Sequence, residues 1–169
     1  MNKARLYFVG DAVLRMRATP VGEIDDNIRK TLDSMESLMR AERGAGLAAP
    51  QVGVLLRMIV FAEERDGKVH KAINPKIISR SAKLVVMNEG CLSVQGPGGP
   101  VFADVERPES IVMEWADENG APHREELGGI AARVVQHEVD HLDGILFIDY
   151  LSSAKREMVM RKVRKKRPI

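Results

Sequence analysis

The stretch of this 169-residue chain with the clearest chemical potential is His137-Glu138-Val139-Asp140-His141. Residues four apart on an α-helix lie one above the other, so His137 and His141 can bind the same metal ion. Glu138 then lies beside the metal and can act as the base for a water molecule that the metal activates. The alternative is an ordinary helix with two histidines that are solvated or packed in the core.

The residues around this motif favour a helix that would position it. Five apolar or functional positions recur at helical spacing and would share one face: Ile130, Val134, His137, Glu138 and His141. Gly144 follows shortly after the second histidine and would end the helix.

A catalytic metal site needs three protein ligands and one open position, and the third ligand is not where other enzymes place it. In the metzincin pattern a third histidine follows two residues after a glycine. Here Phe147 occupies that place after Gly144. A glutamate from a later helix is the other familiar solution, but the only acidic residue in the C-terminal stretch is Glu157, in a run of Lys and Arg.

The single cysteine, Cys91, is therefore our candidate for the third ligand. An isolated cysteine is usually an inert buried thiol. The incomplete histidine pair and the glycine-containing loops favour the ligand instead, so we predict a Cys91/His137/His141 metal site. A lone cysteine also cannot form an internal disulfide, which fits a reducing compartment.

The sequence resembles peptide deformylase in three motifs that keep the order and rough spacing of that family. They are Gly44-Ala-Gly-Leu-Ala-Ala-Pro-Gln51, Glu89-Gly-Cys-Leu-Ser93 and Gln136-His-Glu-Val-Asp-His-Leu142. The resemblance covers most of the chain, from Val13-Leu-Arg15 through Ile73-Asn-Pro75 to Gly144-Ile-Leu-Phe-Ile-Asp149. It implies a cytoplasmic metal-dependent hydrolase that removes the N-formyl group from the N-terminal formyl-methionine of newly synthesised proteins and releases formate.

The resemblance also implies roles for residues outside the ligand set. Gln51 carries an amide that can donate a hydrogen bond to a developing oxyanion, and the backbone N–H of Leu92 would join it. The metal would natively be Fe²⁺, with Zn²⁺, Ni²⁺ or Co²⁺ also accepted. We expect Glu89 and Arg107 to form an ion pair that braces the Cys91 loop, or else to be two solvated charges.

The methionine side chain of the substrate would enter an apolar pocket. The resemblance and the spacing suggest four residues for this pocket and for pairing with the peptide: Gly46, Leu47, Ile130 and Val134. One departure from the family lies nearby, in the stretch from Gln95 to Pro100, where Gln95 stands at the usual proline and no arginine precedes Arg107. We expect this Gly/Pro-rich stretch to be an exposed, mobile loop that affects substrate affinity and inhibitor response.

Composition and periodicity predict one soluble α+β domain over residues 1–169, with mainly antiparallel strands around the central metal-binding helix. An N-terminal helix would start at Asp25 or Asp26 and run to about Arg43, followed by a tight loop from Gly44 to Gln51. Strands are expected at 58–62, 69–73, 76–78, 83–87, 111–115 and 125–127, with turns at Asp66-Gly67 and Asn119-Gly120. No apolar run approaches a membrane span, and no signal peptide is visible.

The charge is unevenly distributed. Residues 153–169 contain eight Lys or Arg and one Glu, whereas residues 1–152 contain 18 basic and 23 acidic residues. We predict a basic C-terminal helix that starts near Ser152 or Ser153 and ends before Pro168. Some deformylases dock on the ribosome through such a helix, so the resemblance suggests the ribosome as a partner; the alternative is a solvated charged helix.

Two other functions remain open at this stage. A small zinc endopeptidase would use the same histidine motif but needs a third ligand other than Cys91. A nucleic-acid-binding module would use the basic tail and merely retain a dead metal site. The presence of the complete set Gln51, Cys91, His137, Glu138 and His141 argues against decay.

Overall fold

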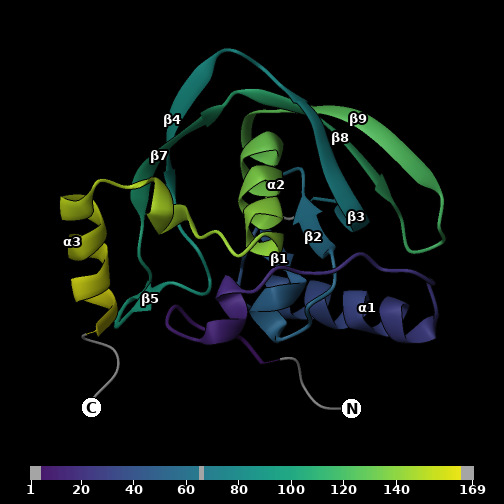
Figure 1. Ribbon diagram of the computed structural model, residues 1–169, viewed down its shortest axis with the longest axis horizontal. Coiled ribbons are helices and arrows are strands. Elements are labelled where there is room, and N and C mark those ends of the chain that lie inside the picture. The colour runs from purple at the N-terminus through teal and green to yellow at the C-terminus, as the bar shows by residue number, and fades with distance from the viewer. Residues whose placement is uncertain (1–4, 65–66, 165–169) are drawn as a thin grey trace.

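The computed structural model describes residues 5–64 and 67–164. An antiparallel sheet of five strands curves around one central helix, α2 (Gly129–Leu142), as Figure 1 shows. The sheet order is β1 (Gly46–Ala48), β2 (Met58–Ala62), β3 (Val69–Arg80), β8 (Ser110–Ala116) and β9 (Pro122–Gly128). This arrangement confirms the expected single α+β domain.

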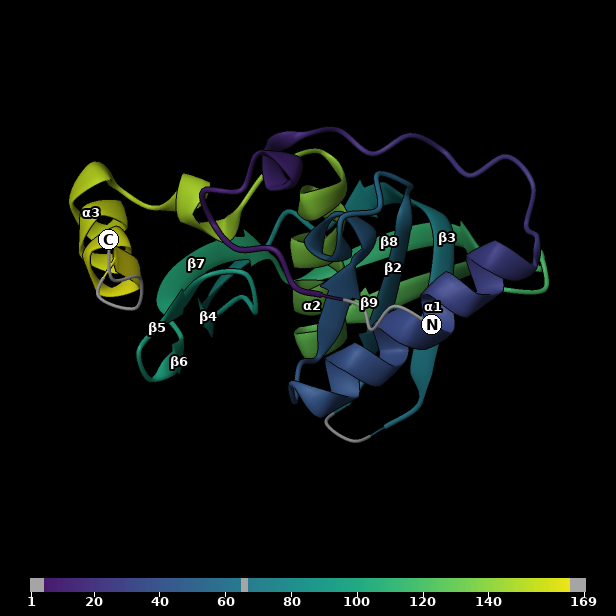
Figure 2. The ribbon, with the colours of Figure 1, turned by 90° about the horizontal axis from the view of Figure 1, so that it is seen from below.

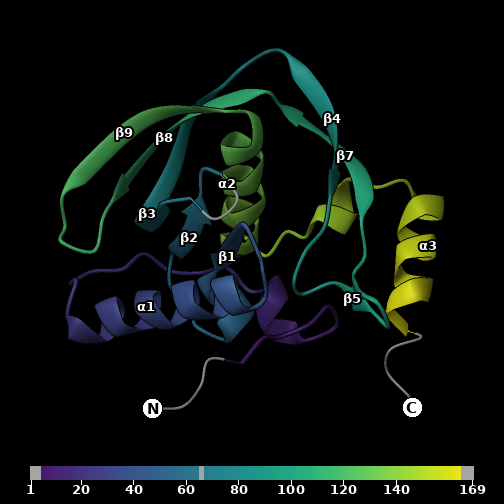
Figure 3. The same cartoon turned by 180° about the vertical axis from the view of Figure 1, so that it is seen from behind.

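Helix α1 (Asp26–Ala41) lies along one side of the sheet, which Figure 3 shows from behind. Its start is set by Asp25, whose side chain accepts a hydrogen bond from the Ile28 N–H at 2.9 Å, as an N-cap residue should. Three residues of its apolar stripe are fully or almost fully buried against β1 and β2: Leu32, Met35 and Met39. The predicted N-terminal helix is thus confirmed.

Helix α2 is buried on most of its surface, which fixes the motif it carries. Its apolar residues pack on the concave face of the sheet: Ala131, Ala132, Val135, Val139 and Leu142. The chain then turns at Gly144 with a φ of +74°, where an added Cβ would lie 2.6 Å from the Arg15 carbonyl oxygen. Only glycine satisfies both conditions, so the helix stops where the sequence predicts.

A separate two-stranded ribbon, β4 (Leu84–Glu89) paired with β7 (Ala103–Pro108), supplies the Cys91 loop. Between its strands lies the short hairpin β5 (Gln95–Gly96) and β6 (Gly99–Pro100). Figure 2 shows this hairpin beside α3 (Ser153–Arg164), at the end of the molecule away from α1.

The structure corrects several details of the expected fold. The region expected to be a loop contains β1, because Gly46–Ala48 pairs with Phe61–Ile59 of β2, and a 3-10 helix, Ala49–Val52. The strands expected at 69–73 and 76–78 form one continuous strand, β3. The sequence does not predict β7. The stretch from Gln95 to Pro100 is not simply an exposed loop: Gly96 is buried, and a Cβ there would lie 3.1 Å from the Lys162 carbonyl oxygen.

Other expectations stand within the described residues. The strands predicted at 58–62 and 111–115 are β2 and β8, and the one predicted at 83–87 is β4 shifted by one or two residues. Asp66 of the predicted Asp66-Gly67 turn and the end of the predicted tail helix lie outside those residues. Among the helices that the structure describes, none has the length and apolar character needed to cross a membrane.

Candidate active site

The three predicted metal ligands meet at the centre of the molecule. Two come from α2 and the third, Cys91, from the turn that follows β4. The His141 Nε2 lies 3.3 Å from the Cys91 Sγ and 3.2 Å from the His137 Nε2. All three side chains are buried.

These separations suit a metal ion. Tetrahedral ligands held about 2.0–2.3 Å from an ion lie roughly 3.3–3.7 Å from one another. The Cys91 sulfur and one ring nitrogen of each histidine lie within 4.8 Å of one another. Such a grouping stabilises the fold little by itself, but it is the arrangement that a metal ion requires. One sulfur and two nitrogens are donors that suit Fe²⁺, Zn²⁺, Ni²⁺ and Co²⁺. The residues present therefore fit a divalent transition metal.

Glu89 holds the first histidine from behind. Its Oε1 accepts a hydrogen bond from the His137 Nδ1 at 2.6 Å, which leaves the Nε2 to face Cys91 and His141. Arg107 donates hydrogen bonds to the same carboxylate from two nitrogens, at 2.7 Å and 2.9 Å, so the expected ion pair is present and buried. Arg107 also donates to Asp140 at 2.7 Å and lies over the Tyr150 ring.

This network determines the charge of Glu89. Burial raises the pKa of a carboxyl, but the hydrogen bonds from His137 and Arg107 outweigh that effect and hold the pKa of Glu89 well below its usual range. Glu89 is consequently an anion that stabilises the imidazole of His137 in one orientation.

Glu138 lies on the other side of the ligands, facing β1. It is 4% exposed, and its Oε2 has no hydrogen-bond partner among the described residues. Burial raises the pKa of Glu138 to about 7. A carboxylate with such a pKa exchanges protons readily near neutral pH, which is what a general base and acid must do.

Gly46 makes room for this carboxylate. A Cβ at position 46 would lie 2.7 Å from both the Glu138 Oε1 and the Val134 Cγ1. Because such distances do not occur between real atoms, any larger residue would displace Glu138 or the strand.

Gln51 presents its amide nitrogen to the metal site. Its Oε1 accepts a hydrogen bond from the Ala48 N–H at 2.8 Å, and its Nε2 lies 3.1 Å from the Ser93 Oγ and 3.6 Å from the Cys91 Sγ. The side chain is buried, and hydrogen bonds at both its oxygen and its nitrogen hold the amide in place. Among the described residues no hydrogen bond uses the N–H of Leu92, the residue that follows Cys91.

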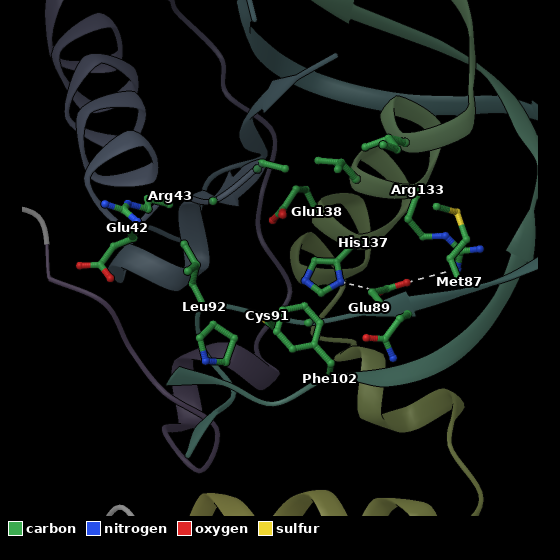
Figure 4. A pocket seen from close by; sticks show the side chains of 18 of the residues that line it. Glu42, Arg43, Met87, Glu89, Cys91, Leu92, Phe102, Arg133, His137 and Glu138 are labelled. Atoms are coloured by element: carbon green, nitrogen blue, oxygen red, sulfur yellow. Dashed lines mark hydrogen bonds and ion pairs between the residues drawn. The ribbon is translucent and has the colours of Figure 1, made fainter. Parts of the chain in front are cut away.

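A cavity of about 390 Å³ opens beside these residues (Figure 4). Its walls include Gly46, Ile130 and Val134, as the sequence suggests, together with Met87 and Phe102. Leu47 requires a correction. Side chains alternate between the two faces of a strand, so Leu47, next to Gly46 on β1, is fully buried in the core against α1 and does not line the cavity.

Several lining residues were not found from the sequence, among them Met87, Phe102 and Arg133. Met87 and Phe102 flank the Cys91 loop, and Phe102 covers Gly90, where a Cβ would meet its ring at 2.6 Å. Arg133 lies on α2 four residues before His137, a spacing that could have indicated a shared face. It contacts Glu89 at 3.3 Å.

Comparisons with known proteins agree on one family. The profile of the family "Polypeptide deformylase" matches residues 3–157. The chain is 46% identical over 165 residues to the peptide deformylase of Rhizorhabdus wittichii, covering 93% of this chain and 91% of that protein. A crystal structure of peptide deformylase from Ehrlichia chaffeensis in complex with actinonin is 38% identical, with a TM-score of 0.92 and full coverage of both chains. Another, from Legionella pneumophila, is 36% identical with a TM-score of 0.89, covering 95% of this chain and 93% of that one.

Proposed function

This chain belongs to the peptide deformylase family, and we propose that it removes the N-formyl group of nascent peptides with Cys91, His137 and His141 as metal ligands. The family membership establishes a metal-dependent hydrolase that acts on N-formyl peptides. The observation that carries the residue assignment is the convergence of one sulfur and two nitrogens, within 4.8 Å of one another, at the end of an apolar cavity.

A divalent ion held by these ligands would supply a Lewis acid that makes water nucleophilic at neutral pH. Glu138 takes the proton of the attacking water and later returns it to the leaving amine, a shuttle that its pKa of about 7 supports. The Gln51 Nε2 and the Leu92 N–H donate hydrogen bonds to the formyl oxygen as its negative charge develops. Both donors are neutral, so they favour the charged transition state more than the uncharged substrate.

The cavity fits the methionine side chain. Its walls are largely apolar at Met87, Ile130 and Val134, which suits a thioether. Phe102 lies at the mouth and is 56% exposed, so a ligand would cover it. The backbone near Gly46, on the edge strand β1, would pair with the peptide that follows the methionine.

Fe²⁺ is our proposal for the native metal. The donor set also fits Zn²⁺, Ni²⁺ and Co²⁺, and the family resemblance favours iron. The test is to purify the protein without oxygen, measure its metal content, and assay formate release from formyl-methionyl peptides after reconstitution with each ion. Iron-loaded protein should be the most active. Cleavage of internal peptide bonds without formate release would instead identify a zinc endopeptidase.

We further propose that α3 contacts the ribosome, which would place the enzyme in the cytoplasm. Basic side chains of α3 are exposed, including Lys155, Arg156 and Arg161, while Val159 and Val163 hold the helix to the core that contains Cys91. Such a helix can bind phosphates through its exposed face without leaving the enzyme. The rest of the basic tail, residues 165–169, lies outside the described residues.

A further inference from the structure

Arg133 is a buried charged residue that the reaction described above does not use. The residue is only 7% exposed, and its side chain lines the cavity beside Met87, as Figure 4 shows. It lies four residues before His137 on α2, so both side chains leave the helix on the same face. Burying a guanidinium costs free energy unless it is paired with hydrogen-bond acceptors or an opposite charge. Arg133 has both kinds of partner.

The guanidinium connects α2 to both strands of the β4–β7 ribbon. Its Nη1 donates to the Val105 carbonyl at 2.9 Å, and its Nη2 donates to the Val85 carbonyl at 2.7 Å. The same Nη1 lies 3.3 Å from the Glu89 Oε2. Arg133 therefore contacts the carboxylate that holds His137 and also the two strands that support that carboxylate.

With Arg133 included, both oxygens of Glu89 have two donors each. Oε1 receives His137 and Arg107, and Oε2 receives Arg107 and Arg133. The two guanidiniums also balance the two carboxylates of this cluster, Glu89 and Asp140. Removing Arg133 would leave one carboxylate charge uncompensated and would leave the Glu89 Oε2 with a single donor, Arg107.

We propose that Arg133 is a positioning residue for the deformylase reaction: it fixes the Glu89 carboxylate and, through it, the His137 imidazole that binds the metal. The proposal rests on the proposed function, because it assumes that His137 is a ligand. Groups that hydrogen-bond directly to a metal ligand, as Glu89 does to His137, typically change metal affinity by about 10- to 100-fold when they are replaced. Arg133 acts one contact further out, so we expect an effect at the lower end of that range.

Metal release tests this role independently of catalysis. The variant Arg133→Met keeps an unbranched apolar stem against the cavity but has no guanidinium. We load it and the wild type with Co²⁺, add excess chelator, and measure the cobalt that remains bound over time. Arg133→Met should lose cobalt at least about 10-fold faster than the wild type. In the loaded enzyme kcat should fall while KM stays within about threefold, because the stem still walls the cavity.

Gln136→Met is the matched control. Gln136 is also buried on α2, and its Nε2 donates to the Pro108 carbonyl at the end of β7, but it does not contact Glu89. Both variants thus remove side-chain hydrogen bonds to the ribbon: Arg133→Met removes those to the Val105 and Val85 carbonyls, and Gln136→Met removes the one to the Pro108 carbonyl. Gln136→Met should release cobalt within about twofold of the wild-type rate. Equally fast release from both variants would mean that loosening the ribbon explains the effect, and the proposal would be wrong.

A double-mutant cycle tests the route through Glu89. If Arg133 acts through this carboxylate, Arg133→Met should accelerate cobalt release much less in a Glu89→Gln background than in the wild type. Fully additive effects would contradict that route. Arg133→Lys provides the test if Arg133→Met does not fold: one ammonium cannot hold Glu89 and two carbonyls together, so release should be faster than in the wild type, and a wild-type rate would overturn the proposal.

Formate release by the wild type tests the proposed function, whereas cobalt retention tests the positioning role, so the two are measured separately. A wild type that binds cobalt but releases no formate would refute the proposed function, while the dependence of cobalt retention on Arg133 would still decide the positioning role.

Discussion

The cavity beside the metal site has a buried floor and an exposed rim, and the two are built in different ways. The floor consists of α2, the Cys91 turn and the buried polar side chains around them: Gln51, Glu89, Arg107, Arg133 and His137. The rim includes Phe102 and Ile130, which are 56% and 57% exposed, and the β5–β6 hairpin. The floor is arranged to hold reacting groups within tenths of an ångström, whereas the rim can vary in sequence without disturbing them. We therefore expect substitutions in the floor to abolish activity and substitutions on the rim to adjust it.

Loss of the Cys91 sulfur should have the largest effect. Cys91→Ala removes one of the three proposed ligands, so the variant should lose most of its metal and all deformylation. Cys91→Asp supplies an oxygen ligand and should retain metal with a reduced rate. Elemental analysis and formate release measure both. Full metal occupancy and full activity in Cys91→Ala would remove this residue from the site.

Glu138→Ala should separate catalysis from metal binding within the floor. Glu138 is not among the three proposed ligands, so the variant should keep its metal. Its kcat should fall by roughly 10²-fold or more, the usual cost of losing a general acid–base group. Turnover near the wild-type rate would show that Glu138 has no such role.

Alanine substitutions at two glycines, one in the floor and one on the rim, test the difference directly. Gly46→Ala would place a methyl group 2.7 Å from Glu138 and Val134, so it should lower kcat/KM severely and destabilise the fold by about 1–3 kcal/mol. Gly98→Ala, in the β5–β6 turn, meets nothing within 4 Å and should leave both quantities nearly unchanged. Kinetics and denaturant unfolding of the two variants measure the contrast. A Gly46→Ala variant as active as Gly98→Ala would contradict the packing described here.

The sequence predicts the floor better than the rim for a physical reason. His137, Glu138 and His141 are recognised because their spacing matches the period of a helix, a local property. Arg133 was missed because its partner Glu89 lies 44 residues away in the chain. The sequence alone puts Leu47 in the cavity because it does not reveal β1. The face that a strand residue occupies depends on pairing with a distant strand, here β2. The short strands β5, β6 and β7 were missed for the same reason.

The floor should also make stability depend on pH. The pKa of Glu89 is held below its ordinary value of 4.5 in the folded protein, so the unfolded chain binds more protons there. The stabilisation by ionised Glu89 is therefore complete above about pH 4.5 and is lost progressively as the pH falls below it. In metal-free protein, Glu89→Gln should show a shallower loss of unfolding free energy between about pH 5 and pH 3 than the wild type.

Glu106→Gln is the control for that experiment, since Glu106 lies on the exposed face of β7. Its pH dependence should match the wild type in denaturant titrations at each pH. If Glu89→Gln and the wild type lose stability with the same slope, the buried ion pair does not govern acid stability.

Removing charge from α3 should have the smallest effect on the reaction. Deletion of residues 154–169 is a poor test, because it would also remove Val159 and Val163 from the core that contains Cys91. Replacing Lys155, Arg156 and Arg161 with Gln keeps that core and removes three exposed positive charges. Formate release from short formyl peptides should then stay within about twofold of the wild type, since the floor is untouched.

Co-sedimentation with ribosomes at low salt should fall steeply, because phosphate contacts depend on each basic side chain and weaken with added salt. Sedimentation equal to that of the wild type would show that α3 only covers the core behind Cys91.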